Sequence, residues 1–245
     1  MNQAIVLNCE KLVFGYDSLK KAAAGLVMPF DFELSAGEVV ALLGENGCGK
    51  STFLKTICGL VEAVSGRIVL EGRGLEEIPV RERAKLVSLT RMGAVVCDRM
   101  KVRDYVSLGR MPYAGLFDGR SAEDERIIDE SIALLDLVSF TDRWMTELSD
   151  GERSRVYLAE AIAQQVKVLL LDEPNAFLDI PRSRRLFEML RNLAKKMQMG
   201  VIVSTHSVEY AEKYCDRIMV IANGQMRVAK AQCARDEGLL DWTNP

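Results

Sequence analysis

Runs of consecutive apolar residues recur along the chain and predict strands that are buried on both faces of a sheet. These runs occupy residues 39–43, 168–171 and 218–221, and a further strand is predicted over residues 201–204, where three apolar residues are followed by Ser204. Between residues 171 and 201, Leu186, Leu190, Leu193 and Met197 recur at helical spacing and predict one face of a helix. Near-continuous apolar strands that alternate with helices are typical of a parallel sheet with helices on both sides. The pattern therefore predicts an α/β fold.

The first third of the chain has a different pattern, in which short strands dominate. Residues 4–14 alternate loosely between apolar and polar side chains and predict a first strand, and residues 26–34 predict a second. Residues 67–70 predict a return strand that closes at Glu71 and Gly72. Up to this point the pattern indicates a β-rich segment that contains one helix.

Residues 98–165 change character and predict a helical insertion. The apolar residues that recur at helical spacing in its middle are Ile127, Ile128, Ile132, Leu135 and Val138. A second helix is expected over about residues 152–165. We expect residues 1–245 to form a single domain, with a helical subdomain over about residues 92–158.

Composition narrows the class of protein. Apolar residues make up 49% and charged residues 27% of the 245 residues, which is ordinary for a globular domain. The formal net charge of −3 gives no sign of a global nucleic-acid surface. The six cysteines are scattered without CxxC pairs, which argues against a disulfide framework or a metal site. No leader opens the chain, and no window approaches the ~18 apolar residues that span a bilayer, so we expect a cytoplasmic location.

A glycine-rich loop directly follows the apolar run at 39–43. Its residues are Gly44, Glu45, Asn46, Gly47, Cys48, Gly49, Lys50, Ser51 and Thr52. They match the GxxxxGK[ST] phosphate-loop pattern between a strand and an apolar helix, which disfavours a glycine-rich turn without function. The glycines let the backbone approach phosphates closely, and the loop N–H groups and the helix start bind the anion. Lys50 is expected to contact the β- and γ-phosphates and Ser51 to ligate Mg²⁺, so the predicted ligand is a magnesium nucleoside triphosphate.

The run at 168–171 ends in two acids, Asp172 and Glu173. In doubly wound sheets ligands sit outside the carboxyl ends of the strands, so both acids are expected to face the phosphate loop. Asp172 would hold Mg²⁺ through its water shell, and Glu173 would orient the attacking water and accept its proton. The alternative is two solvated acids at a strand end, which the phosphate loop upstream disfavours.

Three further segments add to this acid pair. Ser149 precedes a helix and is placed to cap it with free N–H groups aimed at an anion, although a plain helix cap would look the same. Residues 177–179 follow the acids after a short loop. His206 is the only histidine and follows a strand end. A lone histidine is more often a surface or core residue, but its position near the other segments favours a functional role.

Five sequence segments now stand in a fixed order. They are GENGCGKST at 44–52, LSDGE at 148–152, LLLDEP at 169–174, FLD at 177–179 and STHS at 204–207. With them the chain resembles the nucleotide-binding subunit of an ATP-binding-cassette (ABC) transporter over roughly residues 4–230. The resemblance implies a P-loop NTPase core with a mostly parallel sheet, an N-terminal antiparallel β subdomain and an inserted helical subdomain. It also implies an ATPase with ATP and Mg²⁺ as cofactors that works as a homodimer.

The resemblance assigns roles to single residues. Tyr16 falls where the family places an aromatic that stacks on adenine. Two copies would clamp two ATP molecules, with the phosphate loop of one copy facing Ser149 and Gly151 of the other. Asp179 would lie at the subunit contact, and His206 would bind the γ-phosphate and sense its loss. The expected catalytic residues are Glu173, His206 and Lys50, and the expected metal ligands are Ser51 and Asp172.

The sequence also carries a subfamily signal and one departure from the family pattern. Residues 102–117 and 121–124 are similar to stretches in subunits that energise uptake of iron chelates, haem or cobalamin. The family usually has a glutamine after the strand that precedes the helical insertion, where this chain has Arg91. An arginine cannot accept a hydrogen bond or ligate a cation. Either hydrolysis proceeds through Glu173, which is our hypothesis, or coupling to the membrane partner is altered.

We therefore predict the ATP-hydrolysing subunit of an importer of an iron-chelate-type solute. It would lie at the cytoplasmic face of the membrane, partnered by separate permease subunits and indirectly by a substrate-binding protein, with no nucleic acid involved. Two alternatives stay open. One is a soluble cassette ATPase without a permease, of the iron–sulfur assembly type. The other is a regulatory module that binds ATP without turnover, for which Arg91 is the only support.

Overall fold

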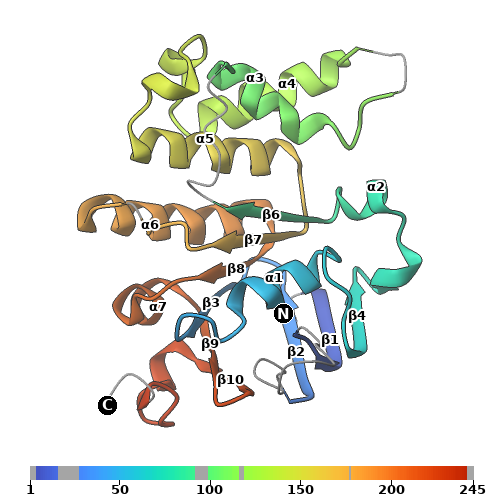
Figure 1. The fold of residues 1–245 in the computed structure, drawn as a ribbon. Coiled ribbons are helices and arrows are strands. Elements are labelled where there is room, and N and C mark those ends of the chain that lie inside the picture. Colours follow the sequence, from blue (N-terminus) through green and yellow to red (C-terminus); the bar gives the residue numbers. More distant parts are fainter. Residues whose placement is uncertain (1–3, 16–27, 92–98, 116–118, 177, 242–245) are drawn as a thin grey trace.

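The computed structural model describes residues 4–15, 28–91, 99–115, 119–176 and 178–241 (Figure 1). Its strands form two sheets, with helices packed around them. The larger sheet has six strands in the order β10-β9-β3-β8-β7-β6, and the smaller has four in the order β2-β1-β4-β5. The predicted α/β class is confirmed.

The six-stranded sheet is parallel except at one edge. Its strands are β3 (Val39–Gly44), β6 (Val87–Arg91), β7 (Val168–Asp172), β8 (Gly200–Ser204), β9 (Arg217–Ala222) and β10 (Gln225–Lys230). The edge strand β10 pairs antiparallel with β9, whereas the other neighbouring pairs are parallel. Every residue of β3, β7 and β8 is buried, as their continuous apolar runs predict.

The four-stranded sheet is antiparallel, as expected for the N-terminal part. Its strands are β1 (Ile5–Val13), β2 (Phe30–Ser35), β4 (Ser65–Leu70) and β5 (Arg73–Gly74). β1 pairs with β2 on one side and with β4 on the other. The second predicted strand begins at Phe30 rather than at residue 26, and residues 26–27 lie outside the described ranges.

The two faces of the six-stranded sheet carry different layers. The helices that cover them are α1 (Lys50–Ile57), α5 (Asp150–Ala163), α6 (Ile180–Met197) and α7 (Val208–Tyr214). Val39, Ala41 and Leu43 pack in the core that holds α5, α6 and α7. Val40 and Leu42 belong to the opposite core, with α1 and the four-stranded sheet. Because side chains of a strand alternate between faces, α1 and α5 lie on opposite sides of the sheet.

A helical layer lies at the top of Figure 1. It contains α3 (Val102–Ser107) and α4 (Ala122–Leu134), which pack on α5, while the short α2 (Val80–Arg83) lies apart from it. One prediction for a helix face was wrong. α4 ends at Leu134, so Val138 lies in a separate 3₁₀ turn and is 64% exposed. The helix predicted from Leu186, Leu190, Leu193 and Met197 is present as α6, in which the three leucines are buried and Met197, the last residue, is 37% exposed.

A buried arginine holds the helical layer together. The Arg110 guanidinium donates to Asp124 Oδ1 at 2.8 Å and to the carbonyl of Ala163 at 2.8 Å. Its Cζ lies 3.7 Å from the centre of the Tyr113 ring. Hydrogen bonds from Ser121 and Arg110 lower the pKa of the Asp124 carboxyl to about 2. The two stretches that carry the subfamily signal, 102–117 and 121–124, therefore meet at one ion pair.

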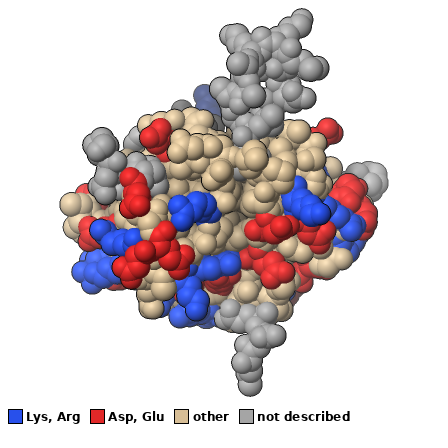
Figure 2. Space-filling model, turned by 90° about the horizontal axis from the view of Figure 1, so that it is seen from below, with Lys and Arg blue, Asp and Glu red and all other residues tan. Residues whose placement is uncertain are grey.

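The surface carries charges of both signs. On the face seen in Figure 2, the Lys and Arg side chains that are described are interspersed with Asp and Glu. Mixed charges of this kind do not build a strong field of one sign. Within the described ranges, no helix combines the length and the apolar character needed to cross a membrane.

Candidate functional site

The phosphate-loop pattern lies between β3 and α1, at the carboxyl edge of the six-stranded sheet. Gly44 ends β3 with φ of 148°, and a Cβ there would lie 2.6 Å from the carbonyl oxygen of Ile221. Gly49 caps α1 with φ of 111°, a conformation that side chains disfavour. Glu45, Asn46 and Gly47 are exposed, so the outer part of the loop is open to solvent.

Lys50 is folded back along this loop. Its Nζ donates to the carbonyl oxygens of Gly44 at 2.8 Å and Glu45 at 3.0 Å, and the residue is 5% exposed. The ammonium group is therefore already held beside the backbone that would surround a phosphate. Cys48, Gly49, Ser51 and Thr52 are half-buried around it. Burial raises the pKa of the Cys48 thiol, and nearby Lys50 offsets part of the rise.

The acid pair lies at the carboxyl end of β7, on the same edge of the sheet. Asp172 is 6% exposed, and its Oδ1 accepts a hydrogen bond from Ser204 Oγ at 2.9 Å. Glu173 takes a left-handed conformation with φ of 51°, and its N–H donates to the same Ser204 Oγ at 2.8 Å. A side chain at positive φ is unusual and tends to occur at functional sites.

Glu173 and His206 are brought together. His206 Nε2 lies 2.9 Å from Glu173 Oε1, and both side chains are partly open to solvent. The two residues line an open pocket of about 430 Å³, together with Asn175, Thr205 and Ser207. An imidazole and a carboxylate at this distance can hold or pass a proton at the mouth of the sheet.

Buried hydroxyls fix the segments that carry these groups. Thr205 Oγ1 donates to Asn175 Oδ1 at 3.0 Å and accepts from the N–H of Ser207 at 3.1 Å. Ser204 and Thr205 lie in the STHS segment, but no role was predicted for either of them or for Asn175. The sequence feature that could have identified them is a pair of hydroxyl residues at the end of one apolar run, in a chain where another apolar run ends in two acids.

Ser149 caps α5, as predicted from its position. Its Oγ accepts from the N–H of Glu152 at 3.4 Å, while the Glu152 carboxylate accepts from the Ser149 N–H at 2.8 Å. The pKa of the Glu152 carboxyl is lowered by a hydrogen bond that the Ser149 hydroxyl donates to it at 2.7 Å and by the one from the Ser149 N–H. Ser149 and Glu152 thus form a reciprocal capping box at the start of α5.

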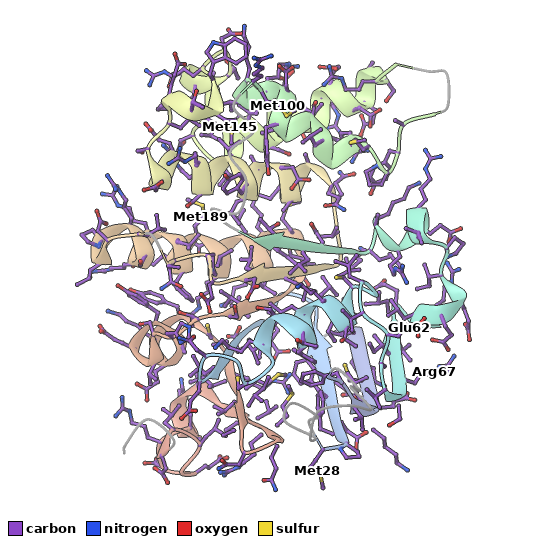
Figure 3. The ribbon with its side chains drawn as sticks, viewed as in Figure 1. Met28, Glu62, Arg67, Met100, Met145 and Met189 are labelled. Atoms are coloured by element: carbon purple, nitrogen blue, oxygen red, sulfur yellow. The ribbon has the colours of Figure 1, made fainter. Side chains whose placement is uncertain are left out.

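A second pocket, of about 290 Å³, opens beside this cap between α5 and α6. Gly151, Leu178 and Arg182 line it together with Met189, which lies between α6 and the helical layer in Figure 3. Asp179 caps α6, because its Oδ1 accepts from the N–H of Arg182 at 2.9 Å.

The predicted residues thus form two groups in one chain. Lys50, Asp172, Glu173 and His206 lie at the carboxyl edge of the sheet, whereas Ser149 and Gly151 begin a helix on the face opposite α1 (Figure 1). Arg91 is the last residue of β6 and does not follow the strand. Its backbone pairs in register with that of Asp172 in β7. Tyr16 and Phe177 lie outside the described residues.

The donor set suits Mg²⁺ bound together with phosphates. Among the described residues, no three His, Cys, Asp or Glu side chains gather as they would in an all-protein metal site. Mg²⁺ prefers oxygen ligands, keeps several waters, and is typically held by one or two carboxylates plus substrate phosphates. The Asp172 carboxylate and the Ser51 hydroxyl provide such oxygen donors.

Comparison with known proteins agrees with this arrangement. The family model described as ABC transporter matches residues 27–176. The petrobactin import ATP-binding protein FatE of Bacillus anthracis is 35% identical over 213 residues, which cover 86% of this chain and 84% of FatE. The siderophore transport system ATP-binding protein YusV of Bacillus subtilis is 29% identical over 88% of this chain and 76% of its own.

Solved structures share the fold. A chain from an inward-facing metal-chelate type ABC transporter superposes with a TM-score of 0.84 at 25% identity, covering 97% of this chain and 88% of its own. A structure titled as the ATP-binding subunit of an ABC transporter superposes with a TM-score of 0.74 at 28% identity, covering 96% and 94%.

Proposed function

Because this chain belongs to the ABC transporter family, whose ATP-binding cassettes are ATPases, we propose that it hydrolyses ATP to drive an importer. The observation that carries the hydrolysis is the contact of 2.9 Å between Glu173 and His206, directly beside the buried Asp172. This contact puts a base and its orienting partner at the edge of the sheet that also holds the phosphate loop.

The groups at the carboxyl edge of the sheet would take separate parts in phosphoryl transfer. The loop N–H groups and Lys50 bind the β- and γ-phosphates and stabilise their charge. Asp172 and Ser51 would hold Mg²⁺, which when bound neutralises charge on the phosphate oxygens. Glu173 orients the attacking water and accepts its proton, and His206 contacts the γ-phosphate and holds Glu173 in place.

The positions of Ser149 and Lys50 favour a homodimer. The helix that Ser149 caps and the helix that Lys50 begins pack on opposite faces of the sheet, in separate cores. We propose that Ser149 and Gly151 of one chain complete the nucleotide site of the partner, with the exposed Asp179 at the contact. ATP binding would then close the dimer, and hydrolysis would open it.

The cargo class is proposed from relatives and from the helical layer. Relatives at 29–35% identity are named for petrobactin import, cobalamin import and siderophore transport. The ion pair between Arg110 and Asp124 joins the two stretches that carry the subfamily signal. We propose uptake of a siderophore, haem or cobalamin through separate permease subunits at the cytoplasmic face of the membrane, fed by a substrate-binding protein. Residues 92–158 would act as a helical subdomain within one cassette.

Two measurements test the proposal. Phosphate release by the purified protein should exceed that of the Glu173→Gln variant by about 100-fold, the order of a general base's contribution. Detergent extraction of membranes from the native host, with this chain affinity-tagged, should yield a complex with a hydrophobic permease. Hydrolysis without a membrane partner would favour the soluble cassette ATPase, and ATP binding without hydrolysis would favour the regulatory module.

A further inference from the structure

Ser204 is a hydroxyl residue at the end of an otherwise apolar strand. It is the last residue of β8 and is fully buried, with 0% exposure. The preceding residue, Val203, pairs in register with Leu171 of β7, so Ser204 comes level with Asp172. A buried hydroxyl costs free energy unless it is hydrogen-bonded, and this one meets both acids of the candidate site.

One hydroxyl group makes two hydrogen bonds in opposite senses. Ser204 Oγ donates its proton to Asp172 Oδ1 at 2.9 Å. The same oxygen accepts the N–H of Glu173 at 2.8 Å. A serine has one donor and two acceptor lone pairs, so these bonds are compatible. The buried Ser204 Oγ therefore links the Asp172 carboxylate to the backbone N–H of Glu173.

The Glu173 bond supports an unusual backbone conformation. At φ of 51° Glu173 has left the β7 strand, and its N–H no longer follows the strand ladder. Within the part of the chain that the structure describes, Ser204 Oγ is the acceptor recorded for this N–H. The turn held in this way directs the Glu173 carboxylate to His206 Nε2 at 2.9 Å.

Ser131 is a buried serine with a different hydrogen bond. Ser131 of α4 is 2% exposed, and its Oγ donates to the carbonyl of Ile127 one turn earlier, which is ordinary for a helix serine. Removal of that hydroxyl should leave the helix intact, because the helix has its own backbone hydrogen bonds and Ser131 Oγ donates to a carbonyl rather than to an acid. Ser131 therefore provides a matched control for the loss of a buried hydroxyl.

We propose that Ser204 is a positioning residue that fixes the Asp172 carboxylate and the Glu173 backbone relative to each other. The inference rests on the proposed hydrolysis. Without the Ser204 hydroxyl, the Asp172 carboxylate loses the donor that orients it, and the turn at Glu173 loses the acceptor that holds it. Both metal affinity and turnover should then fall, because the fully buried Ser204 acts through the two acids that it holds.

The test compares Ser204→Ala, Ser204→Thr and Ser131→Ala in the purified full chain. Mn²⁺ replaces Mg²⁺ as the probe and is titrated by electron paramagnetic resonance with the slowly hydrolysed analogue ATPγS present. Partners that orient metal ligands typically contribute on the order of 10–100-fold to affinity or activity. We expect Ser204→Ala to weaken Mn²⁺ binding about tenfold and to lower kcat about tenfold or more, with KM for ATP changed less than about threefold.

The other variants separate positioning from folding. Ser204→Thr keeps a hydroxyl and should recover both quantities to within about threefold, and Ser131→Ala should match the wild type. If Ser204→Ala does not fold, Ser204→Cys, whose thiol is a weak donor, should show the same losses. Wild-type values in the folded Ser204→Ala or Ser204→Cys variant, or equal losses in Ser131→Ala, would overturn the inference. A wild type without hydrolysis would overturn the proposed function, while the Mn²⁺ titration would still decide the role of Ser204.

Discussion

His206 Nε2 and Glu173 Oε1 lie 2.9 Å apart, although 33 residues separate them in the chain. The contact forms because β7 and β8 are parallel neighbours, so their carboxyl ends meet at one edge. A glutamine at position 173 keeps the shape of the side chain but cannot accept a proton. Glu173→Gln should therefore bind ATP with wild-type affinity while phosphate release falls about 100-fold.

The same variant tests the homodimer. If hydrolysis opens the dimer, Glu173→Gln should accumulate as a dimer in size-exclusion chromatography with ATP and Mg²⁺, and should elute as a monomer without nucleotide. Glu209→Gln changes an exposed acid of α7 nearby and provides the control, with wild-type turnover expected. Phosphate release from Glu173→Gln at the wild-type rate would contradict its role as the base.

A second prediction concerns the cation of the phosphate loop. Lys50 Nζ is held by the carbonyl oxygens of Gly44 and Glu45, so its charge lies where the loop would surround a phosphate. Lys50→Ala should weaken ATP binding at least about tenfold, because a charge-assisted hydrogen bond contributes roughly 1.5–3 kcal/mol. Isothermal titration calorimetry measures the affinity. Lys55→Ala, at the opposite end of the same helix, should leave it unchanged.

A third prediction concerns the buried ion pair of the helical layer. Arg110 and Asp124 are each less than a tenth exposed, and Arg110 also donates to the carbonyl of Ala163. Arg110→Met leaves the Asp124 charge buried without its partner, so the free energy of unfolding in urea should fall by about 3–5 kcal/mol. Arg126→Ala removes an exposed arginine of α4, the helix that carries Asp124, and should lower the free energy of unfolding by less than about 1 kcal/mol. Equal losses of unfolding free energy in the two variants would contradict the prediction that the buried pair stabilises the chain more than an exposed pair does.

The same pair predicts acid sensitivity. The pKa of Asp124 is lowered to about 2 in the folded chain, from 3.8. A carboxyl with a lowered pKa contributes stability that is present above its unfolded pKa and is lost as pH falls toward the folded value. Asp124→Asn should therefore lose less stability than the wild type between pH 4 and pH 2, as measured by urea unfolding at each pH. A parallel decline of the two proteins would contradict this prediction.

The sequence predicted the strands that are buried on both faces better than it predicted the edges. Edge strand β10 (Gln225–Lys230) was missed, because the polar, exposed Gln225, Arg227 and Lys230 interrupt its apolar residues and leave no apolar run. The helix predicted through Val138 ends at Leu134, because Asp136 turns into a left-handed conformation with φ of 53°. Helical spacing of apolar residues does not reveal such a turn.

The meeting of the acids with His206 was predictable, because parallel strands present their carboxyl ends together. The proposed role of Ser204 was not predictable, because it depends on which atoms of the neighbouring strand end its hydroxyl bonds. Sequence spacing gives the strand and the position, but the direction of a hydrogen bond depends on register. The register of β7 against β8 sets that contact.

The last prediction concerns Glu160 of α5. Burial raises the pKa of this partly buried carboxyl to about 7, from 4.5. An acid with a raised pKa is tolerated while protonated, so the wild type should lose stability as pH rises from about 4.5 through 7. Glu160→Gln carries no charge and should escape this loss. Relative to the wild type, it should gain up to about 3 kcal/mol between pH 5 and pH 8, at 1.36 kcal/mol per pKa unit. Urea unfolding of both proteins at the two pH values measures the gain, and a difference that does not change with pH would show that Glu160 ionises freely in the folded chain.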